Sequence, residues 1–246
     1  MRYKNVLITG GSGKLGRALL ASGLSGRNIL VPTRGEMDIT DKLSVKEYFD
    51  KHKIDAVIHC AALTSMKVCE DDPAEAIDVN ITGTSNIIEN ALKKIDTRII
   101  YISTDYVYPC VKGPYKEEDK TGPFTVYGWT KFGGECVAKI VFNHCIIRTS
   151  FFEPNNIPFD SAPTDAFCSK IPISELVGAI IELIDSDFIG TVNVGREKVS
   201  LYEAFKGYKK DIKAVTLEEI NRIAPIKRAR DSSLDVSLWK RLMANN

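Results

Sequence analysis

Near its N-terminus the chain reads Val6-Leu7-Ile8-Thr9-Gly10-Gly11-Ser12-Gly13-Lys14-Leu15-Gly16. The short apolar run predicts a buried strand, and the amphipathic residues 13–22 predict a helix. Glycines at positions 10, 13 and 16 allow a tight turn, a close approach of the backbone to a pyrophosphate, and close packing of helix on strand. Because the free N–H groups at a helix N-terminus attract phosphate, this strand–turn–helix predicts a dinucleotide-binding site.

The alternation of apolar runs and helical stretches continues through the first 150 residues. Further strands are predicted at residues 28–31, 55–59, 98–103 and 145–149, and helices at 45–51 and 73–94. Apolar runs of this kind are typical of strands covered on both faces. The pattern therefore predicts an α/β fold, a Rossmann-like doubly wound parallel sheet with helices on both faces.

The pattern changes after Thr149. Residues 151–173 contain four prolines and predict a loop or cap over the site. Beyond it we expect a helix at 173–184, a strand at 191–194, and helices at 201–210, 217–223 and 234–242. We therefore divide the chain into an NAD(P)-binding domain, residues 1–150, and a smaller region, residues 151–246, that partly returns to the sheet.

Composition narrows the class of protein. Lysine and arginine total 33 against 32 acidic residues, which argues against a nucleic-acid partner. No apolar run approaches the ~18 residues of a membrane span, and the N-terminal residues lack the apolar core of a signal peptide. The six cysteines form no Cys-x-x-Cys pair and the three histidines lack metal-ligand spacing. We expect a cytoplasmic protein with free thiols and no metal site.

The choice of dinucleotide depends on the end of the second predicted strand. An NAD site usually has an acidic residue there, which binds the ribose 2′-hydroxyl. Here the chain has Arg34, whose planar guanidinium suits a 2′-phosphate. This favours NADPH, while Glu36 and Asp38 leave NADH open as an alternative. Asp38 and Ile39 are expected near the adenine.

The third predicted strand ends in small residues, Cys60-Ala61-Ala62-Leu63-Thr64. Small side chains allow a cofactor to lie against the chain, although the same residues also suit ordinary tight packing. With the glycine turn, they complete the cofactor site expected from the residues.

A tyrosine and a lysine stand four residues apart in Tyr127-Gly128-Trp129-Thr130-Lys131. This spacing places both on one helix face. A free tyrosine has a pKa of ~10, and we expect the Lys131 ammonium to lower the pKa of Tyr127 and to hold a ribose hydroxyl. Thr104 follows the fourth strand, where parallel sheets bind ligands, and its hydroxyl is suited to donate a hydrogen bond to a substrate oxygen.

Together these motifs resemble the extended short-chain dehydrogenase/reductases, and more narrowly the dTDP-4-dehydrorhamnose reductase branch. The resemblance covers nearly the whole chain. It is carried by residues 9–16, 37–41, 55–64, 79–83, 103–108, 127–131 with Gly134-Glu135, and 228–235.

The resemblance implies an NAD(P)H-dependent reductase of a 4-keto-6-deoxy sugar nucleotide in deoxysugar biosynthesis. Thr104, Tyr127 and Lys131 match the catalytic triad, in which Tyr127 protonates the 4-keto oxygen and the nicotinamide delivers hydride. Asn80 matches the asparagine that supports the site. The positions near the sugar are Thr104, Asp105, Tyr106 and Arg228. The cofactor positions are Gly10, Ser12, Gly13, Lys14, Leu15, Gly16, Arg34, Asp38, Ile39, Cys60, Ala61, Ala62, Thr64, Asn80, Tyr127 and Lys131.

The chain departs from this branch in its C-terminal region. The segment after Arg148 is much shorter than in the family, Ser150-Phe151-Phe152-Glu153 replaces a tryptophan-containing turn, and Ala229 replaces a proline. Two alternatives follow: a bifunctional epimerase/reductase of a nucleotide sugar, and a catalytically silent NADP-binding regulatory subunit. Members of the family often form two-fold dimers, so a homodimer is also open.

Overall fold

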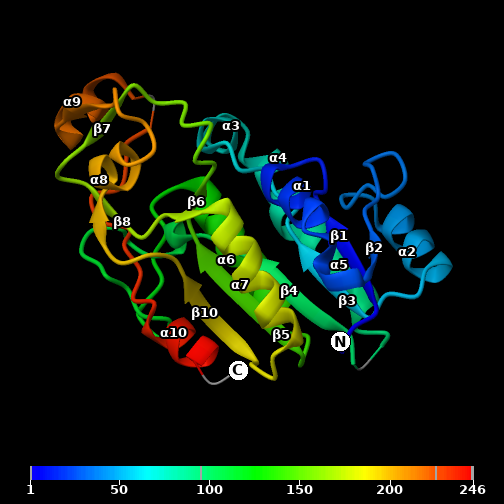
Figure 1. The fold of residues 1–246 in the computed structure, drawn as a ribbon. Coiled ribbons are helices and arrows are strands. Elements are labelled where there is room, and N and C mark those ends of the chain that lie inside the picture. Colours follow the sequence, from blue (N-terminus) through cyan, green and yellow to red (C-terminus); the bar gives the residue numbers. More distant parts are fainter. Residues whose placement is uncertain (1, 95, 225, 245–246) are drawn as a thin grey trace.

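The computed structural model describes residues 2–94, 96–224 and 226–244 (Figure 1). Within them, a central parallel sheet has the strand order β10-β5-β4-β3-β1-β2. The strands are β1 Asn5–Thr9, β2 Asn28–Leu30, β3 Ala56–His59, β4 Arg98–Ile102, β5 His144–Thr149 and β10 Gly190–Val194. From β1 the chain adds β2 on one side and then β3 on the other, so the order reverses at β1, where doubly wound sheets bind ligands.

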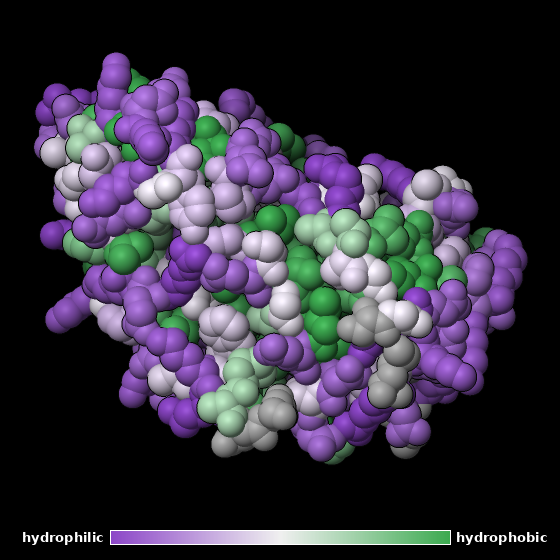
Figure 2. All heavy atoms as spheres, in the orientation of Figure 1, coloured by the Kyte–Doolittle hydropathy of each residue, from purple (hydrophilic) through white to green (hydrophobic). Residues whose placement is uncertain are grey.

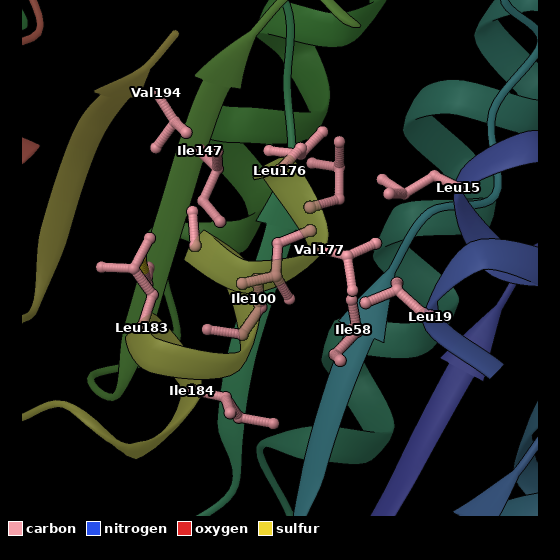
Figure 3. Packing of buried hydrophobic residues seen from close by; sticks show 14 of the residues in the cluster. Leu15, Leu19, Ile58, Ile100, Ile147, Leu176, Val177, Leu183, Ile184 and Val194 are labelled. Atoms are coloured by element: carbon pink, nitrogen blue, oxygen red, sulfur yellow. The ribbon is translucent and has the colours of Figure 1, made fainter. Parts of the chain in front are cut away.

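Both faces of the sheet are covered by helices, because successive strand residues point to opposite faces. Ile58, Ile100 and Ile147 pack with α1 (Lys14–Ala21) and α7 (Ile173–Asp185), as Figure 3 shows. Their neighbours Val57 and Ile99 pack instead among buried residues of α2 (Lys42–Lys51), α5 (Gly83–Ala91) and α6 (Val126–Ala138). The predicted doubly wound α/β fold is confirmed.

The predicted single helix at residues 73–94 is wrong in detail. The segment consists of α4 (Pro73–Ile77), a π-helical turn at Asp78–Thr82, and α5. Asn80 lies in the π-helical turn, and its side chain accepts a hydrogen bond from the Leu63 N–H (2.8 Å) and donates to Thr130 Oγ1 (2.9 Å). Such turns often occur at functional sites, and this one fixes the end of β3 relative to α6.

The region after β5 is more ordered than the predicted loop at residues 151–173. Short strands pair in twos: β6 with β9, β7 with β12, and β8 with β11. The elements are β6 Phe151–Phe152, β7 Ser161–Pro163, β8 Phe167–Cys168, β9 Ile171–Pro172, β11 Val199–Ser200, α8 Leu201–Lys206, β12 Lys213–Val215, α9 Leu217–Ile223 and α10 Ser237–Ala244. We call residues 150–172 and 199–235 the cap. The remaining short helices are η1 Gly23–Gly26, α3 Met66–Asp71 and η3 Asp105–Val107.

Two helix boundaries differ from the prediction. The helix expected at 201–210 ends at Lys206. The helix expected at 234–242 begins at Ser237, because Leu234 forms a bridge to Tyr115 and the Asp235 carboxylate accepts a hydrogen bond from the Ser237 N–H.

The cap has a small apolar core of its own, built on Ala162, Phe205 and Ile212. Hydrophilic side chains predominate on its outer surface, at the upper left of Figure 2. In contrast, Trp239 and Leu242 of α10 pack against the large core of the sheet. The last described helix therefore belongs with the sheet.

The described ranges contain no helix long and apolar enough to cross a membrane. They also contain no cluster of three or more potential metal-ligating side chains. The six cysteines are all free.

Candidate functional site

A cavity of about 420 Å³ opens at the carboxyl ends of the central strands. It brings together the glycine turn, the three predicted catalytic residues and part of the cap. The predicted residues that line it are Gly10, Gly13, Lys14, Leu15, Gly16, Cys60, Ala62, Thr64, Thr104, Asp105, Tyr106, Tyr127, Lys131 and Arg228. The structure adds residues that the sequence analysis did not select: Met66, Ile102, Ser103, Thr149, Ser150, Phe151 and Lys170.

The remaining predicted residues lie outside this lining: Ser12, Arg34, Asp38, Ile39, Ala61 and Asn80. Arg34 is highly exposed and its Nε lies 2.8 Å from Asp38 Oδ2, an ion pair that lowers the pKa of Asp38. The Ile39 carbonyl accepts a hydrogen bond from Asn86 of α5 (2.8 Å). Contact of Arg34, Asp38 and Ile39 with the adenosine end of a dinucleotide stays a prediction.

The glycine turn requires residues without a Cβ at two positions. Gly10 has a φ of +69°, and a Cβ there would lie 2.7 Å from the Ala61 nitrogen. A Cβ at Gly16 would lie 2.6 Å from the Gly11 Cα and would collide with the Gly10 carbonyl. Gly13 is the N-cap of α1 and offers no side-chain acceptor. The first N–H groups of α1 are therefore suited to a pyrophosphate.

Ala61 is fixed by a buried polar chain that the sequence analysis did not identify. Its N–H donates to Thr9 Oγ1 (3.2 Å), which lies 2.7 Å from His59 Nδ1. His59 Nε2 lies 3.0 Å from Thr84 Oγ1. Burial lowers the pKa of His59 to about 3, so the ring is neutral and links β1, β3 and α5.

Thr104 and Tyr127 face the cavity from neighbouring elements. Thr104 follows β4, and its Oγ1 accepts a hydrogen bond from the Tyr106 N–H (3.2 Å) and donates to Asp105 Oδ1 (3.1 Å). Thr125 caps α6 by accepting from the Gly128 N–H (3.0 Å), so Tyr127 lies in the first turn of that helix.

The pKa of Tyr127 differs from the sequence prediction. Burial raises it above the ordinary value for tyrosine, and the interaction with Thr104 only partly offsets this effect. Burial lowers the pKa of Lys131 to about 8, and Lys131 Nζ lies 4.2 Å from the centroid of the Tyr101 ring. The prediction that Lys131 lowers the pKa of Tyr127 is wrong for this arrangement, because burial raises that pKa and the group that lowers it is Thr104.

A buried ion pair joins the helix that carries Tyr127 and Lys131 to the central sheet. Glu135 of α6 accepts two hydrogen bonds from Arg148 of β5, with Nε–Oε1 2.9 Å and Nη2–Oε2 2.7 Å. Ser103 donates to the same carboxylate (2.5 Å), and Arg148 also donates to the Tyr108 hydroxyl (2.8 Å). This network joins α6, which carries Tyr127 and Lys131, to β4 and β5.

The cap reaches the cavity through charged side chains. Glu153 pairs with Lys14 of the glycine turn (2.7 Å). Lys170 Nζ donates to Ser150 Oγ (2.7 Å). Burial raises the pKa of the Asp105 carboxyl, and the Lys170 cation partly offsets that rise.

Comparison with known proteins gives consistent matches. The family model described as "RmlD substrate binding domain" matches residues 4–155. A dTDP-4-dehydrorhamnose reductase of Mycolicibacterium smegmatis is 32% identical over 201 residues, which make up 74% of this chain and 61% of that protein. The matched part thus spans about three fifths of the length of that relative.

Two solved structures cover nearly the whole fold. A dTDP-4-dehydrorhamnose reductase from Clostridium acetobutylicum has a TM-score of 0.84 and 28% identity, over 98% of this chain and 97% of that one. A hypothetical dTDP-4-dehydrorhamnose reductase from Sulfolobus tokodaii has a TM-score of 0.85 and 30% identity, over 96% and 94% of the two chains.

Proposed function

This chain belongs to the RmlD substrate binding domain family, and we propose that it is an NAD(P)H-dependent reductase of a 4-keto-6-deoxy sugar nucleotide in deoxysugar biosynthesis. The observation that carries the proposal is the meeting of Thr104, Tyr127 and Lys131 in one cavity with the glycine turn. The similarity to dTDP-4-dehydrorhamnose reductases supports the sugar nucleotide as the substrate class.

We propose the following roles for the side chains. The Tyr127 hydroxyl donates its proton to the 4-keto oxygen, since a raised pKa keeps tyrosine protonated at neutral pH. The Thr104 hydroxyl, which donates to Asp105 in the structure, turns its single hydrogen to the same keto oxygen when the substrate binds. Lys131, with a pKa of about 8, is mostly protonated at pH 7 and holds a ribose hydroxyl. A bound reduced nicotinamide dinucleotide supplies the hydride.

The glycine turn fits such a dinucleotide, because its backbone N–H groups are open at the start of α1. Arg34 favours NADPH through its guanidinium, while its pairing with Asp38 leaves NADH as the alternative. We further propose that residues 1–150 bind the dinucleotide and that residues 151–246 complete the sugar-nucleotide site. A cytoplasmic location and a homodimer stay predictions.

The test follows NADPH oxidation with freshly prepared dTDP- and UDP-4-keto-6-deoxy sugars. We expect turnover with the wild-type protein, and a loss of about 10²–10⁴-fold in kcat for Tyr127→Phe with unchanged NADPH affinity. Phe132→Tyr, which adds a hydroxyl five residues further along α6, is the control that shows whether α6 still folds. A smaller loss in Tyr127→Phe would refute the proton-donor role.

The two alternatives have different outcomes in the same assay. An epimerase/reductase would exchange ring C–H hydrogens with solvent deuterium before reduction. A silent regulatory subunit would bind NADPH tightly and oxidise none of it with any of these substrates.

A further inference from the structure

The charges that line the cavity are unequal. Basic residues on its wall are Lys14, Lys131, Lys170 and Arg228, whereas Asp105 is the acidic residue of the lining. Lys14 is paired with Glu153, and Lys131 lies over the Tyr101 ring. The other two cations are therefore available to an anionic ligand.

Lys170 has a defined position because its neighbours are paired with the end of β5. Strand β9 pairs with β6, and the Ile171 N–H donates to the Ser150 carbonyl (2.9 Å). This pairing places Lys170 beside Ser150, whose Oγ accepts a hydrogen bond from Nζ at 2.7 Å. The ammonium is thus half-buried and held by a neutral hydroxyl.

Neither Lys170 nor Arg228 forms an ion pair within the described residues, although Lys170 acts electrostatically on the buried Asp105 carboxyl. Among the residues that the structure describes, the ion pairs that involve the cap are Lys14–Glu153, Lys198–Asp231, Lys206–Glu203, Lys209–Asp160 and Arg222–Glu218. None includes Lys170 or Arg228. A half-buried ammonium that faces a cavity and donates to a neutral hydroxyl rather than to a carboxylate favours an anion there, since a charged hydrogen bond offsets the cost of removing the ammonium from water.

The position of Lys170 favours an anion of the substrate over the pyrophosphate of the dinucleotide. Lys170 and Arg228 line the cavity together with Asp105 and Tyr106. Asp105 and Tyr106 lie in the turn after β4, next to Thr104. The glycine turn, which fits the dinucleotide, offers its own backbone N–H groups at the start of α1 to a phosphate.

We propose that Lys170, held by Ser150, binds the diphosphate of the sugar nucleotide and that Arg228 binds it from the opposite segment of the cap. This inference rests on the proposed function and names a binding residue that neither the motifs nor the family resemblance supplied.

The test measures binding without turnover, by calorimetry on the NADP⁺-saturated protein. The probes are dTDP-glucose, which has no keto group to reduce, and inorganic pyrophosphate. A charged hydrogen bond to an anion predicts that Lys170→Met raises the Kd of both probes by about 10- to 100-fold. Lys170→Arg should retain most of the affinity. Lys206→Met, on the cap surface outside the cavity, should change neither Kd.

Each outcome has one meaning. Unchanged Kd values in Lys170→Met would overturn the assignment while leaving the proposed function intact. If the Kd of NADP⁺ rises in Lys170→Met as much as the Kd values of the probes do, and does not recover in Lys170→Arg, Lys170 has a structural role. That result would also overturn the assignment. Pyrophosphate binding by the wild type without any sugar-nucleotide binding would overturn the proposed function, and this inference with it.

Discussion

The buried pair of Glu135 and Arg148 gives the sharpest prediction of stability. Their side chains are 0% and 3% exposed, and two hydrogen bonds join them. At about 1.5–3 kcal/mol for each charged hydrogen bond, removing the carboxylate charge should cost about 3–5 kcal/mol, the range found when a buried pair loses one partner. Glu135→Gln keeps the volume and leaves the Arg148 cation uncompensated, so we expect a loss of that size.

The assay is urea unfolding followed by circular dichroism, on Glu135→Gln, Arg148→Met and the double variant. The double variant should be less destabilised than the sum of the single ones, because it no longer buries an unpaired charge; a coupling of about 0.5–3 kcal/mol is expected. Glu218→Gln, which breaks an exposed pair with Arg222, is the control and should have little effect. Additive single costs, or a Glu135→Gln loss below about 1 kcal/mol, would refute the reasoning.

Three further predictions test other parts of the site. His59 has a pKa of about 3 in the fold, whereas in the unfolded chain it takes up its proton near pH 6.5. The free energy of unfolding should therefore fall on acidification between these two pH values, by up to about 1.4 kcal/mol per pH unit. The fall should be shallower in His59→Asn, and equal slopes in the two proteins would contradict this. Arg34→Ala should raise the Kd of NADPH by about 10-fold or more and change the Kd of NADH little, as measured by fluorescence titration. Equal changes in the two Kd values would reject a contact of Arg34 with the 2′-phosphate. Gly16→Ala should destabilise the fold by about 1–3 kcal/mol, because its Cβ would collide with the Gly10 carbonyl. Gly178→Ala, in α7 with open space around the new Cβ, should stabilise it by about 0.5–1 kcal/mol in the same thermal unfolding experiment.

The sheet and its helices could be predicted from the sequence because their signals are local. Val6-Leu7-Ile8 and the glycines that follow define β1 and α1 within a dozen residues. The π-helical turn around Asn80 could not be predicted, because the side chain of Asn80 is held there by two hydrogen bonds to Leu63, 17 residues away. Apolar periodicity alone continues through it as one helix.

The cap residues of the site were missed for a similar reason. Lys170 reaches the cavity through the pairing of β9 with β6, strands of two residues that leave no period in the sequence. Ser150 did carry a usable signal, since it follows directly on β5, and ligands bind beyond the carboxyl ends of parallel strands. The pKa of Tyr127 was mispredicted because spacing shows which residues share a helix face, but it does not show how deeply they are buried.

Helix α7 has a consequence for the order in which the chain acquires its structure during synthesis. Five strands of the sheet are complete by Thr149, yet one face of them is covered largely by residues 173–185 and the outer edge by β10. A nascent chain that has emerged only as far as β5 exposes a broad apolar face and an unpaired strand edge, features that favour aggregation. The shortness of the segment between β5 and α7 limits the time that a ribosome leaves this face uncovered.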